Sequence, residues 1–426
     1  MKTQARHRRN GSLDSGATAT STGPASTAAR RIRLAVVSTS FPAGTWTSSG
    51  IFVERLVANL PAEVEVRVLI PCPETPMSQD VSVPYKLDCF AYGPRSWQRL
   101  AHHPGGIPDA LRRRDPALLL LPLFIPALFF ACVRLAGQVD VMHGNWSIAG
   151  LVAALAARLR GKAAVMTLRG DDVTRADRSP VFALLLGASI LLNHRIVVVS
   201  EAMRECLVRR YPNRSGQIRF IPNGVSLAKP TECTVFHEPL RLMTVGSLIG
   251  RKRLDVLLRA VARPEFPPNA VLRIIGAGPQ RPELEALAAQ LDITSRVVFL
   301  GSVEPSGVAQ HLHWADIFVF ASESEGRPNA VLEAMAAGLP IIATNIPGVR
   351  EMIDNERGLS VPVGDERAMA EAIRFFSGDP AAALKKGRAA RQWLIANELT
   401  WQAAGRQYAA LYAECVATTA PVSCAG

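Results

Sequence analysis

The feature that most constrains this chain is a repeated alternation of short apolar runs with helical patterns. From Arg33 onward, runs of strand length such as RLAVVST, KAAVMTL and RIVVVS are separated by segments with helical periodicity. The same rhythm starts again after the stretch 229–239, with LRLMTVG, AVLRIIG and DIFVFAS. Alternation of this kind predicts parallel strands joined by crossover helices, so we expect two doubly wound α/β lobes. The two halves share no sequence repeat, which argues against a duplicated motif.

The length of the chain agrees with two lobes. Its 426 residues, 48% of them hydrophobic, can bury more core than one average domain requires. We place the first lobe at 31–228 and the second at 229–400. Residues 1–30 are rich in Ser, Thr, Ala, Gly and Arg and are predicted to form a disordered tail, with a transit peptide as the alternative. The helical pattern at 401–416 gathers aromatic residues near one face, and we expect this helix to cross back onto the first lobe.

Cysteine usage and charge bear on the compartment and the partners. The seven cysteines are scattered and include no Cys-x-x-Cys pair, so we expect neither a zinc site nor a disulfide framework, and a reducing cytoplasm. Residues 1–230 hold 29 Lys and Arg against 15 Asp and Glu, an excess of 14, which leaves 19 against 21 in the rest of the chain. A basic first lobe attracts phosphate-bearing substrates or a membrane surface, and solvated arginines are the alternative.

One apolar run, Ala117–Val133, raises the question of membrane contact. It holds 17 residues, fewer than the roughly 20 that a membrane-spanning helix needs, and it contains Pro122 and Pro126, so we expect no span. The cluster Arg112–Arg114 lies just before it. Two readings stay open: an interfacial segment with a basic flank, or a helix pair in the core of the lobe.

The most informative motif is EGRPNAVLEAMAAGLP at 325–340, which follows the predicted strand DIFVFAS. Pro328 suits the first turn of a helix, and Gly338 with Pro340 suits its end, so we expect a helix over 328–337. Its N-terminus then lies at the carboxyl end of a strand. Backbone N–H groups and the helix dipole at such a place bind phosphate or sugar oxygens.

With the two-sheet architecture, this stretch resembles family 4 of the retaining glycosyltransferases, which have the GT-B fold: two Rossmann-like lobes with a cleft between them. The resemblance covers roughly residues 31–415 and rests on a Glu, seven residues and a second Glu inside an EG-x-P…EAMA-x-G-x-P frame. It implies that Glu325 contacts the transferred sugar and Glu333 the ribose of the donor. A carboxylate can accept two hydroxyl hydrogen bonds, which agrees with both roles. Beside Glu325 the family uses backbone amides of the segment Gly326–Asn329. The resemblance therefore implies that Gly326, Arg327, Pro328, Asn329 and Ala330 line the donor.

A second cluster of candidate residues follows the strand that opens the second lobe. The segment VGSLIGRK ends in Arg251 and Lys252, and fixed cations stabilise the charge that grows on a leaving diphosphate, although solvated side chains are the alternative. The family often carries an Arg where this chain has Ser247, so Arg251 is the candidate substitute. The resemblance adds donor contacts from turns after three strands, at Gly246, Ser247, Gly276, Gly278 and Val303.

Polar residues of the first lobe follow its predicted strands, and the resemblance places them on the acceptor side. They are Gly50 in SSGIF, where a plain turn is the alternative, His143, Asn145 and Trp146 in HGNW, and Arg169 and Asp171 in TLRGDD. Many relatives carry His at the place of Arg169, which can hold an anion but cannot act as a neutral base. Asp171 and Asp172 lack an evident third oxygen ligand, so we expect no metal and no cofactor. Asn223-Gly224-Val225 matches the family's hinge between the lobes.

These expectations combine into one reaction. The resemblance implies metal-independent transfer of a hexose from a nucleoside-diphosphate sugar, with retention, and we favour a front-face substitution in which the leaving phosphate takes the acceptor proton. We expect a lipid-linked saccharide acceptor at the cytoplasmic face of the membrane, a role in exopolysaccharide biosynthesis, and no nucleic-acid partner. The alternatives are a nucleotide-sugar epimerase, a sugar phosphorylase, or a non-catalytic nucleotide-sugar-binding subunit.

Overall fold

The structure is a computed structural model, and it describes residues 31–42, 50–73, 83–98, 100–101, 107, 114–227 and 235–419. Some predicted features lie outside these residues. They are the tail 1–30, Arg112 and Arg113 of the arginine cluster, and the lobe boundary between 228 and 229.

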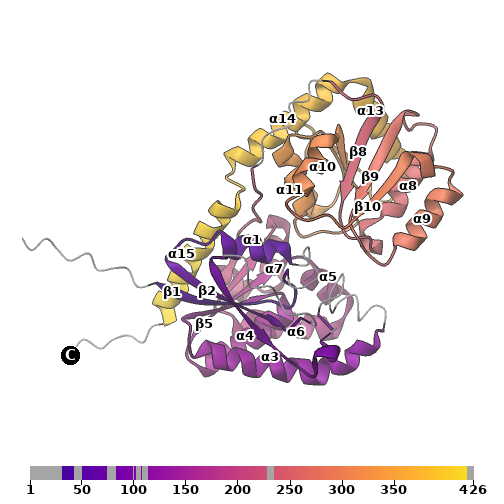
Figure 1. Ribbon diagram of the computed structural model, residues 1–426. Coiled ribbons are helices and arrows are strands. Elements are labelled where there is room, and N and C mark those ends of the chain that lie inside the picture. Colours follow the sequence, from indigo (N-terminus) through magenta and orange to yellow (C-terminus); the bar gives the residue numbers. More distant parts are fainter. Residues whose placement is uncertain are drawn as a thin grey trace, which may run out of the picture. The chain divides into compact units, whose positions relative to one another are not determined.

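The first lobe, called the N-lobe below, is drawn in indigo to magenta in Figure 1. It is built on a parallel sheet of seven strands in the order β3-β2-β1-β4-β5-β6-β7. The strands are β1 (Ile32–Val37), β2 (Val64–Pro71), β3 (Tyr85–Phe90), β4 (Val141–Asn145), β5 (Ala163–Leu168), β6 (Arg195–Val198) and β7 (Ile218–Phe220). The order reverses on either side of β1, which creates a topological switch point between β1 and β4.

Side chains along β1 alternate between the two faces of this sheet. Leu34 and Val36 pack with α1 (Ile51–Ala58) and α15 (Trp401–Thr419), whereas Ala35 and Val37 pack with helices on the other face. Those helices include α3 (Leu121–Ala136) and α4 (Ser147–Leu159), and farther along the sheet α5 (Asp171–Arg178), α6 (Pro180–Leu192) and α7 (Glu201–Arg210). The sheet is therefore buried on both faces, as expected for a parallel sheet with crossover helices.

The second lobe, the C-lobe, repeats this architecture with six parallel strands in the order β10-β9-β8-β11-β12-β13. They are β8 (Leu240–Val245), β9 (Ala270–Ile275), β10 (Val297–Gly301), β11 (Ile317–Phe320), β12 (Ile341–Thr344) and β13 (Leu359–Val361). One face carries α8 (Leu254–Ala262), α9 (Arg281–Gln290) and α13 (Glu366–Gly378), and the other carries α10 (Val308–Trp314), α11 (Asn329–Ala337) and most of α14 (Pro380–Ala396). The predicted fold class, two doubly wound parallel sheets, is confirmed.

The last helix, α15, belongs to the N-lobe by its packing although it follows the C-lobe in sequence. Its buried side chains, among them Trp401, Tyr408 and Tyr412, join the core cluster of Leu34 and Val36. The expected helix over 401–416 therefore continues to Thr419 and does cross back onto the first sheet.

The apolar run at 117–133 forms one continuous helical segment and not a helix pair. A 3-10 turn over Pro116–Leu120 leads directly into α3. The predicted length of 17 residues is too short, because the segment spans 21 residues and would suffice, by length and composition, to cross a membrane. Phe124 and Leu128 are nevertheless fully buried against the sheet. The helix therefore lies along the lobe with one face in the core and the opposite face open.

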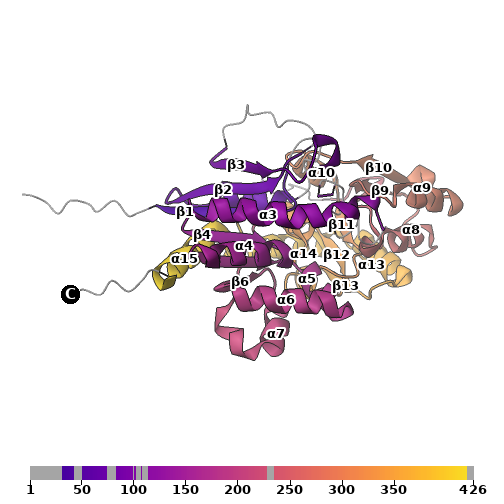
Figure 2. The ribbon, with the colours of Figure 1, turned by 90° about the horizontal axis from the view of Figure 1, so that it is seen from below.

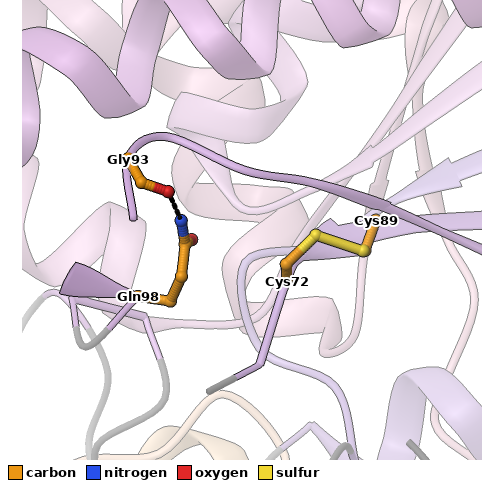
Figure 3. Close-up of a disulfide and its surroundings, with 4 residues drawn as sticks. All are labelled: Cys72, Cys89, Gly93 and Gln98. Carbon is orange, nitrogen blue, oxygen red and sulfur yellow. Dashed lines mark hydrogen bonds between the residues drawn. A yellow bond between two sulfur atoms is a disulfide. The ribbon is translucent and has the colours of Figure 1, made fainter. Parts of the chain in front are cut away.

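The expectation of no disulfide is wrong for one pair of cysteines. Cys72 and Cys89 are joined, with their Cα atoms 4.8 Å apart, a separation that disulfides require (Figure 3). The reason is the strand order: β2 and β3 are neighbours in register, so the residue after Pro71 comes beside the end of β3. A spacing of 17 residues does not reveal which strands pair. Figure 3 also shows the adjacent turn, in which the Gln98 amide donates to the carbonyl oxygen of Gly93 at 2.7 Å.

Candidate active site

A cavity of about 520 Å³ lies where strands of both sheets end at their carboxyl edges. From the N-lobe its wall includes Ser40 after β1 and Trp146 after β4, and from the C-lobe Gly246 after β8 and Glu325 after β11. Each lobe contributes residues next to its topological switch point. Open α/β sheets bind ligands at this place, so the cavity is the candidate site.

The centre of the C-lobe wall is the carboxylate of Glu325. It accepts from Lys252 Nζ at 2.6 Å and from Ser322 Oγ at 3.0 Å, and it lies 3.0 Å from a guanidinium nitrogen of Arg251. Burial alone would raise the pKa of Glu325, but Lys252 and Arg251 outweigh it and hold that pKa below its ordinary value. The site therefore holds one carboxylate against two cationic side chains.

Arg251 also holds the loop that presents Glu325. Its guanidinium donates to the carbonyl oxygen of Ser324 at 2.6 Å and lies 3.7 Å from Asp171 of the N-lobe. Burial disfavours the charge, yet Glu325 and Asp171 raise the pKa of Arg251 above its ordinary value. A cation held on several sides keeps its place and its charge, which suits it to receive a diphosphate.

Helix α11 begins one residue later than predicted, at Asn329, with Pro328 in the capping position before it. It ends as predicted at Gly338, which adopts the left-handed conformation with φ 77°. Arg327, Pro328, Asn329 and Ala330 line the cavity, and the guanidinium of Arg327 lies 3.3 Å from Glu351. Burial lowers the pKa of Arg327 to about 10, which still leaves it charged at neutral pH.

Glu333, one turn into α11, already has a partner. Arg55 of α1 donates to its carboxylate at 2.6 Å, and both side chains line the cavity. Arg55 was not among the expected site residues, although it lies in the helix that directly follows the glycine loop, where a cation can be recognised. Arg175 and Phe182 also line the cavity and carry no local signal that would have identified them.

Two glycine positions explain how the loops come together. A Cβ on Gly326 would lie 2.2 Å from the carbonyl oxygen of Arg169, so only glycine lets the two loops touch. Gly276, with φ 145°, lies against the turn after β8 in the same way. A Cβ added there would lie 1.9 Å from the carbonyl oxygen of Gly246. Gly276 lines the cavity with Ser247 and Val303, while Gly278 packs behind them against Leu248.

On the N-lobe side, Gly50, Trp146, Arg169 and Asp171 line the cavity. Arg169 is tightly held: it donates to Asn145 Oδ1 at 2.9 Å and to Asn223 Oδ1 at 3.0 Å. Burial lowers the pKa of Arg169 to about 10. A cation so enclosed serves to position the wall and the hinge residue Asn223.

His143 and Asn145 do not reach the cavity, which corrects their expected place on the acceptor side. His143 is fully buried and hydrogen-bonded to the hydroxyl of Tyr412 at 2.7 Å and that of Thr167 at 2.8 Å. Burial, with a smaller contribution from Arg169, lowers the pKa of His143 to about 3. The ring is therefore neutral and ties β4 to α15, and Asn145 acts on the cavity through Arg169.

The adjacent acids have separate surroundings. Asp172 accepts from the backbone N–H and the hydroxyl of Ser147, at 2.8 and 2.7 Å, and burial raises its pKa. Asp171 faces Arg251 and Arg175. Across the described ranges, no group of three or more His, Cys, Asp or Glu is placed to hold a metal ion.

Comparison with known families gives two matches that follow each other along the chain. The family described as "Glycosyltransferase Family 4" matches residues 49–229, and that described as "Glycosyl transferases group 1" matches residues 239–379. Together they cover most of both lobes.

Individual relatives are similar over parts of the chain. A D-inositol 3-phosphate glycosyltransferase of Streptomyces avermitilis is 28% identical over 60% of this chain and 61% of its own length. A glycogen synthase of Mycobacterium tuberculosis is 30% identical over 51% and 53%. A GDP-mannose-dependent phosphatidylinositol monomannoside mannosyltransferase of Mycolicibacterium smegmatis is 28% identical over 67% and 73%. The chain thus spans little more than half the length of the first two.

Solved structures match nearly the whole chain. Sucrose-phosphate synthase from Thermosynechococcus elongatus superposes with a TM-score of 0.74 at 25% identity, over 91% of this chain and all of that one. Anabaena HepE, solved with UDP-glucose, superposes with a TM-score of 0.69 at 16% identity, over 91% of this chain and all of that one. The similarity to HepE, at 16% identity, is a similarity of fold.

Proposed function

This chain belongs to the group 1, family 4 glycosyltransferases, and from that premise we propose that it transfers a hexose from a nucleoside-diphosphate sugar to a saccharide acceptor. The observation that carries the proposal is the cluster of Arg251, Lys252 and Glu325 at the start of α11. It joins two cations for a diphosphate with one carboxylate for sugar hydroxyls, beside the amides of a helix N-terminus. The relatives' own substrates differ among themselves, so the hexose and the base stay open.

The reaction follows from these charges. As the bond between the sugar carbon and the phosphate oxygen breaks, its electron pair goes to the diphosphate, and Arg251 and Lys252 stabilise the added charge. Glu325 orients the sugar, and Glu333 accepts from the ribose once Arg55 yields its place. Each carboxylate that lines the cavity already has a hydrogen-bond or ion-pair partner, which disfavours it as a nucleophile; these are Asp171, Asp172, Glu325 and Glu333. We therefore favour a front-face substitution that retains the anomeric configuration. In it the acceptor hydroxyl passes its proton to the leaving phosphate.

For the acceptor we propose a lipid-linked saccharide, handled at the cytoplasmic face of the membrane during exopolysaccharide synthesis. The basic excess of the first lobe and the apolar helix α3 support this choice. The mannosyltransferase relative, whose name specifies a phosphatidylinositol mannoside, points in the same direction.

Acceptor-dependent release of nucleoside diphosphate tests the proposal. The purified chain is incubated with a panel of nucleotide sugars, with and without saccharide acceptors, and released diphosphate is quantified. A transferase releases diphosphate well above background only when the acceptor is present. Interconversion of the donor without an acceptor would indicate an epimerase. Donor binding without turnover on any acceptor would indicate a binding subunit. That alternative is relevant because Ser247 and Arg169 differ from the residues that the family often carries at these positions.

A further inference from the structure

Three helices of the N-lobe form a continuous outer surface on one side of its sheet. α3 packs against α4 and α4 against α6, and Figure 2 shows the three side by side. Large apolar side chains on this surface are at least 60% exposed: Leu119, Phe130, Leu159, Val181, Leu184 and Leu191. We call these six residues the three-helix face. A soluble lobe gains nothing from exposing so many large apolar groups together, so such a surface indicates a binding partner.

The charged residues of the helices that carry the three-helix face have one sign. The sequences of α3, α4 and α6 contain no Asp or Glu, and their two charged residues, Arg134 and Arg158, are both exposed. Three more arginines are exposed: Arg114 before the 3-10 turn that leads into α3, Arg160 directly after α4, and Arg178 at the end of α5. The acids nearest in sequence are engaged elsewhere, since Asp115 caps the turn before α3 and Asp177 pairs with Arg210.

We propose that the three-helix face rests on an anionic lipid bilayer, with its apolar side chains among the acyl chains and its arginines at the phosphates. An apolar centre with a basic rim fits that partner. A second copy of the chain fits poorly, because a two-fold contact would bring arginine rims together without acids to pair them. Insertion of α3 across the bilayer would remove Phe124, Leu128 and Cys132 from the core, where they are fully buried, so the helix lies along the surface.

The position of α6 connects this surface with the cavity. Phe182, in its first turn, lines the cavity, while its neighbour Val181 and, one turn on, Leu184 belong to the three-helix face. The membrane would therefore meet the protein beside the part of the cavity wall that contains Phe182 and Arg175. Resting on the proposed function, we infer that a lipid-linked acceptor keeps its lipid in the bilayer while its saccharide enters at this side.

Co-sedimentation with vesicles tests the surface directly. The full chain is mixed at low salt with vesicles of phosphatidylcholine and phosphatidylglycerol, or of phosphatidylcholine alone. We expect binding to the anionic vesicles, weakened by added salt because screening shortens the reach of the arginines. The double variant Leu184→Glu/Leu191→Glu should reduce the bound fraction at least about tenfold, since each change puts a negative charge where the apolar side chain would enter the lipid.

Phe375→Glu in the C-lobe is the matched control. Phe375 is also a large apolar residue, 57% exposed, and lies outside the three-helix face, so vesicle binding should not change. All substituted side chains are solvent-exposed, and melting temperatures verify that the variants fold. The proposal is overturned if the wild-type protein does not bind anionic vesicles, or if the double variant binds them as well as the wild type does. Wild-type self-association that the double variant abolishes also overturns it, and assigns the face to a dimer contact.

The assay of diphosphate release with a soluble acceptor separates this inference from the proposed function. The double variant should keep wild-type release, because Leu184 and Leu191 do not line the cavity. If the wild-type protein binds vesicles but shows no acceptor-dependent release of diphosphate, the proposed membrane-binding surface stands and the proposed transferase function is wrong. If it releases diphosphate but does not bind vesicles, the proposed function stands and the proposed membrane-binding surface is wrong.

Discussion

The two walls of the cavity differ in how far apart along the chain their defining contacts lie. In the C-lobe wall, Glu325 meets Lys252 across 73 positions within one lobe, with Arg251 beside Lys252 and Ser322 in the same loop as Glu325. In the N-lobe wall, β4 and β5 are fixed through His143 and Thr167, which bond Tyr412 and Tyr408 across 269 and 241 positions. The first wall holds charged groups for chemistry, whereas the second depends on a helix from the far end of the chain.

This difference indicates which residues should affect activity and which should affect the stability of the fold. Charges in the C-lobe wall are paired with one another and face the cavity, so changing them should alter binding and turnover. Groups in the N-lobe network are buried, and His143 is held neutral, so changing them should alter stability first. Four experiments test that division.

The largest effect is expected for Glu325→Gln. The variant keeps the size of the side chain but removes the charge between Lys252 and Arg251, so turnover should fall about 10²–10³-fold. Initial rates of acceptor-dependent diphosphate release measure this. The matched control is Glu323→Gln, an exposed residue of the same loop that does not line the cavity, and it should stay near wild type. Equal rates for Glu325→Gln and wild type would remove Glu325 from the chemistry.

Glu333→Gln should weaken binding of the nucleotide-sugar donor by about 1.5–3 kcal/mol, because hydroxyl groups bond more strongly to a charged acceptor. Titration calorimetry measures the affinity. Arg55→Gln is the informative companion: it frees Glu333 from its 2.6 Å ion pair, so a nucleoside without phosphates should bind more tightly. Unchanged donor affinity in Glu333→Gln would contradict the assignment to the ribose.

His143 should make folding sensitive to acid. Its pKa is about 3 in the folded chain and about 6.5 in the unfolded chain, so below pH 6.5 the unfolded state binds one more proton. The free energy of unfolding should therefore fall by about 1.4 kcal/mol for each pH unit between 6.5 and 3. Urea unfolding at several pH values measures the slope, and comparison with His143→Gln separates it from carboxylates that titrate in the same range. A variant with the wild-type slope would show that His143 does not contribute.

The smallest effect is expected for a chelator. Because Arg251 and Lys252 are proposed to neutralise the diphosphate, EDTA should leave turnover unchanged. Loss of turnover that Mg²⁺ or Mn²⁺ restores would contradict the metal-independent mechanism and reopen the role of Asp171 and Asp172.

The contrast between the walls also explains which residues could be found in advance. Glu325, Lys252 and Arg251 lie just after strands of strong apolar pattern, and parallel strands bring their carboxyl ends to one edge, so the prediction needs no knowledge of distant contacts. Arg55 is brought to Glu333 by the packing of two lobes, and no periodicity within either segment indicates that pairing. His143 was expected to follow an apolar strand, but it lies within β4, where α15 covers it.

The sequence by itself determined the two doubly wound sheets, the helix that ends at Gly338, the glycosyltransferase family and the carboxylates and cations of the C-lobe wall. These features depend on side-chain periodicity, turn chemistry and local spacing, which are written along the chain. Only the tertiary structure decided that Cys72 pairs with Cys89, that α3 has one buried and one open face, that Arg55 holds Glu333 and that His143 is buried. Each of those depends on which distant segments become neighbours, and neighbour relations arise from the packing of whole elements, which no local pattern encodes.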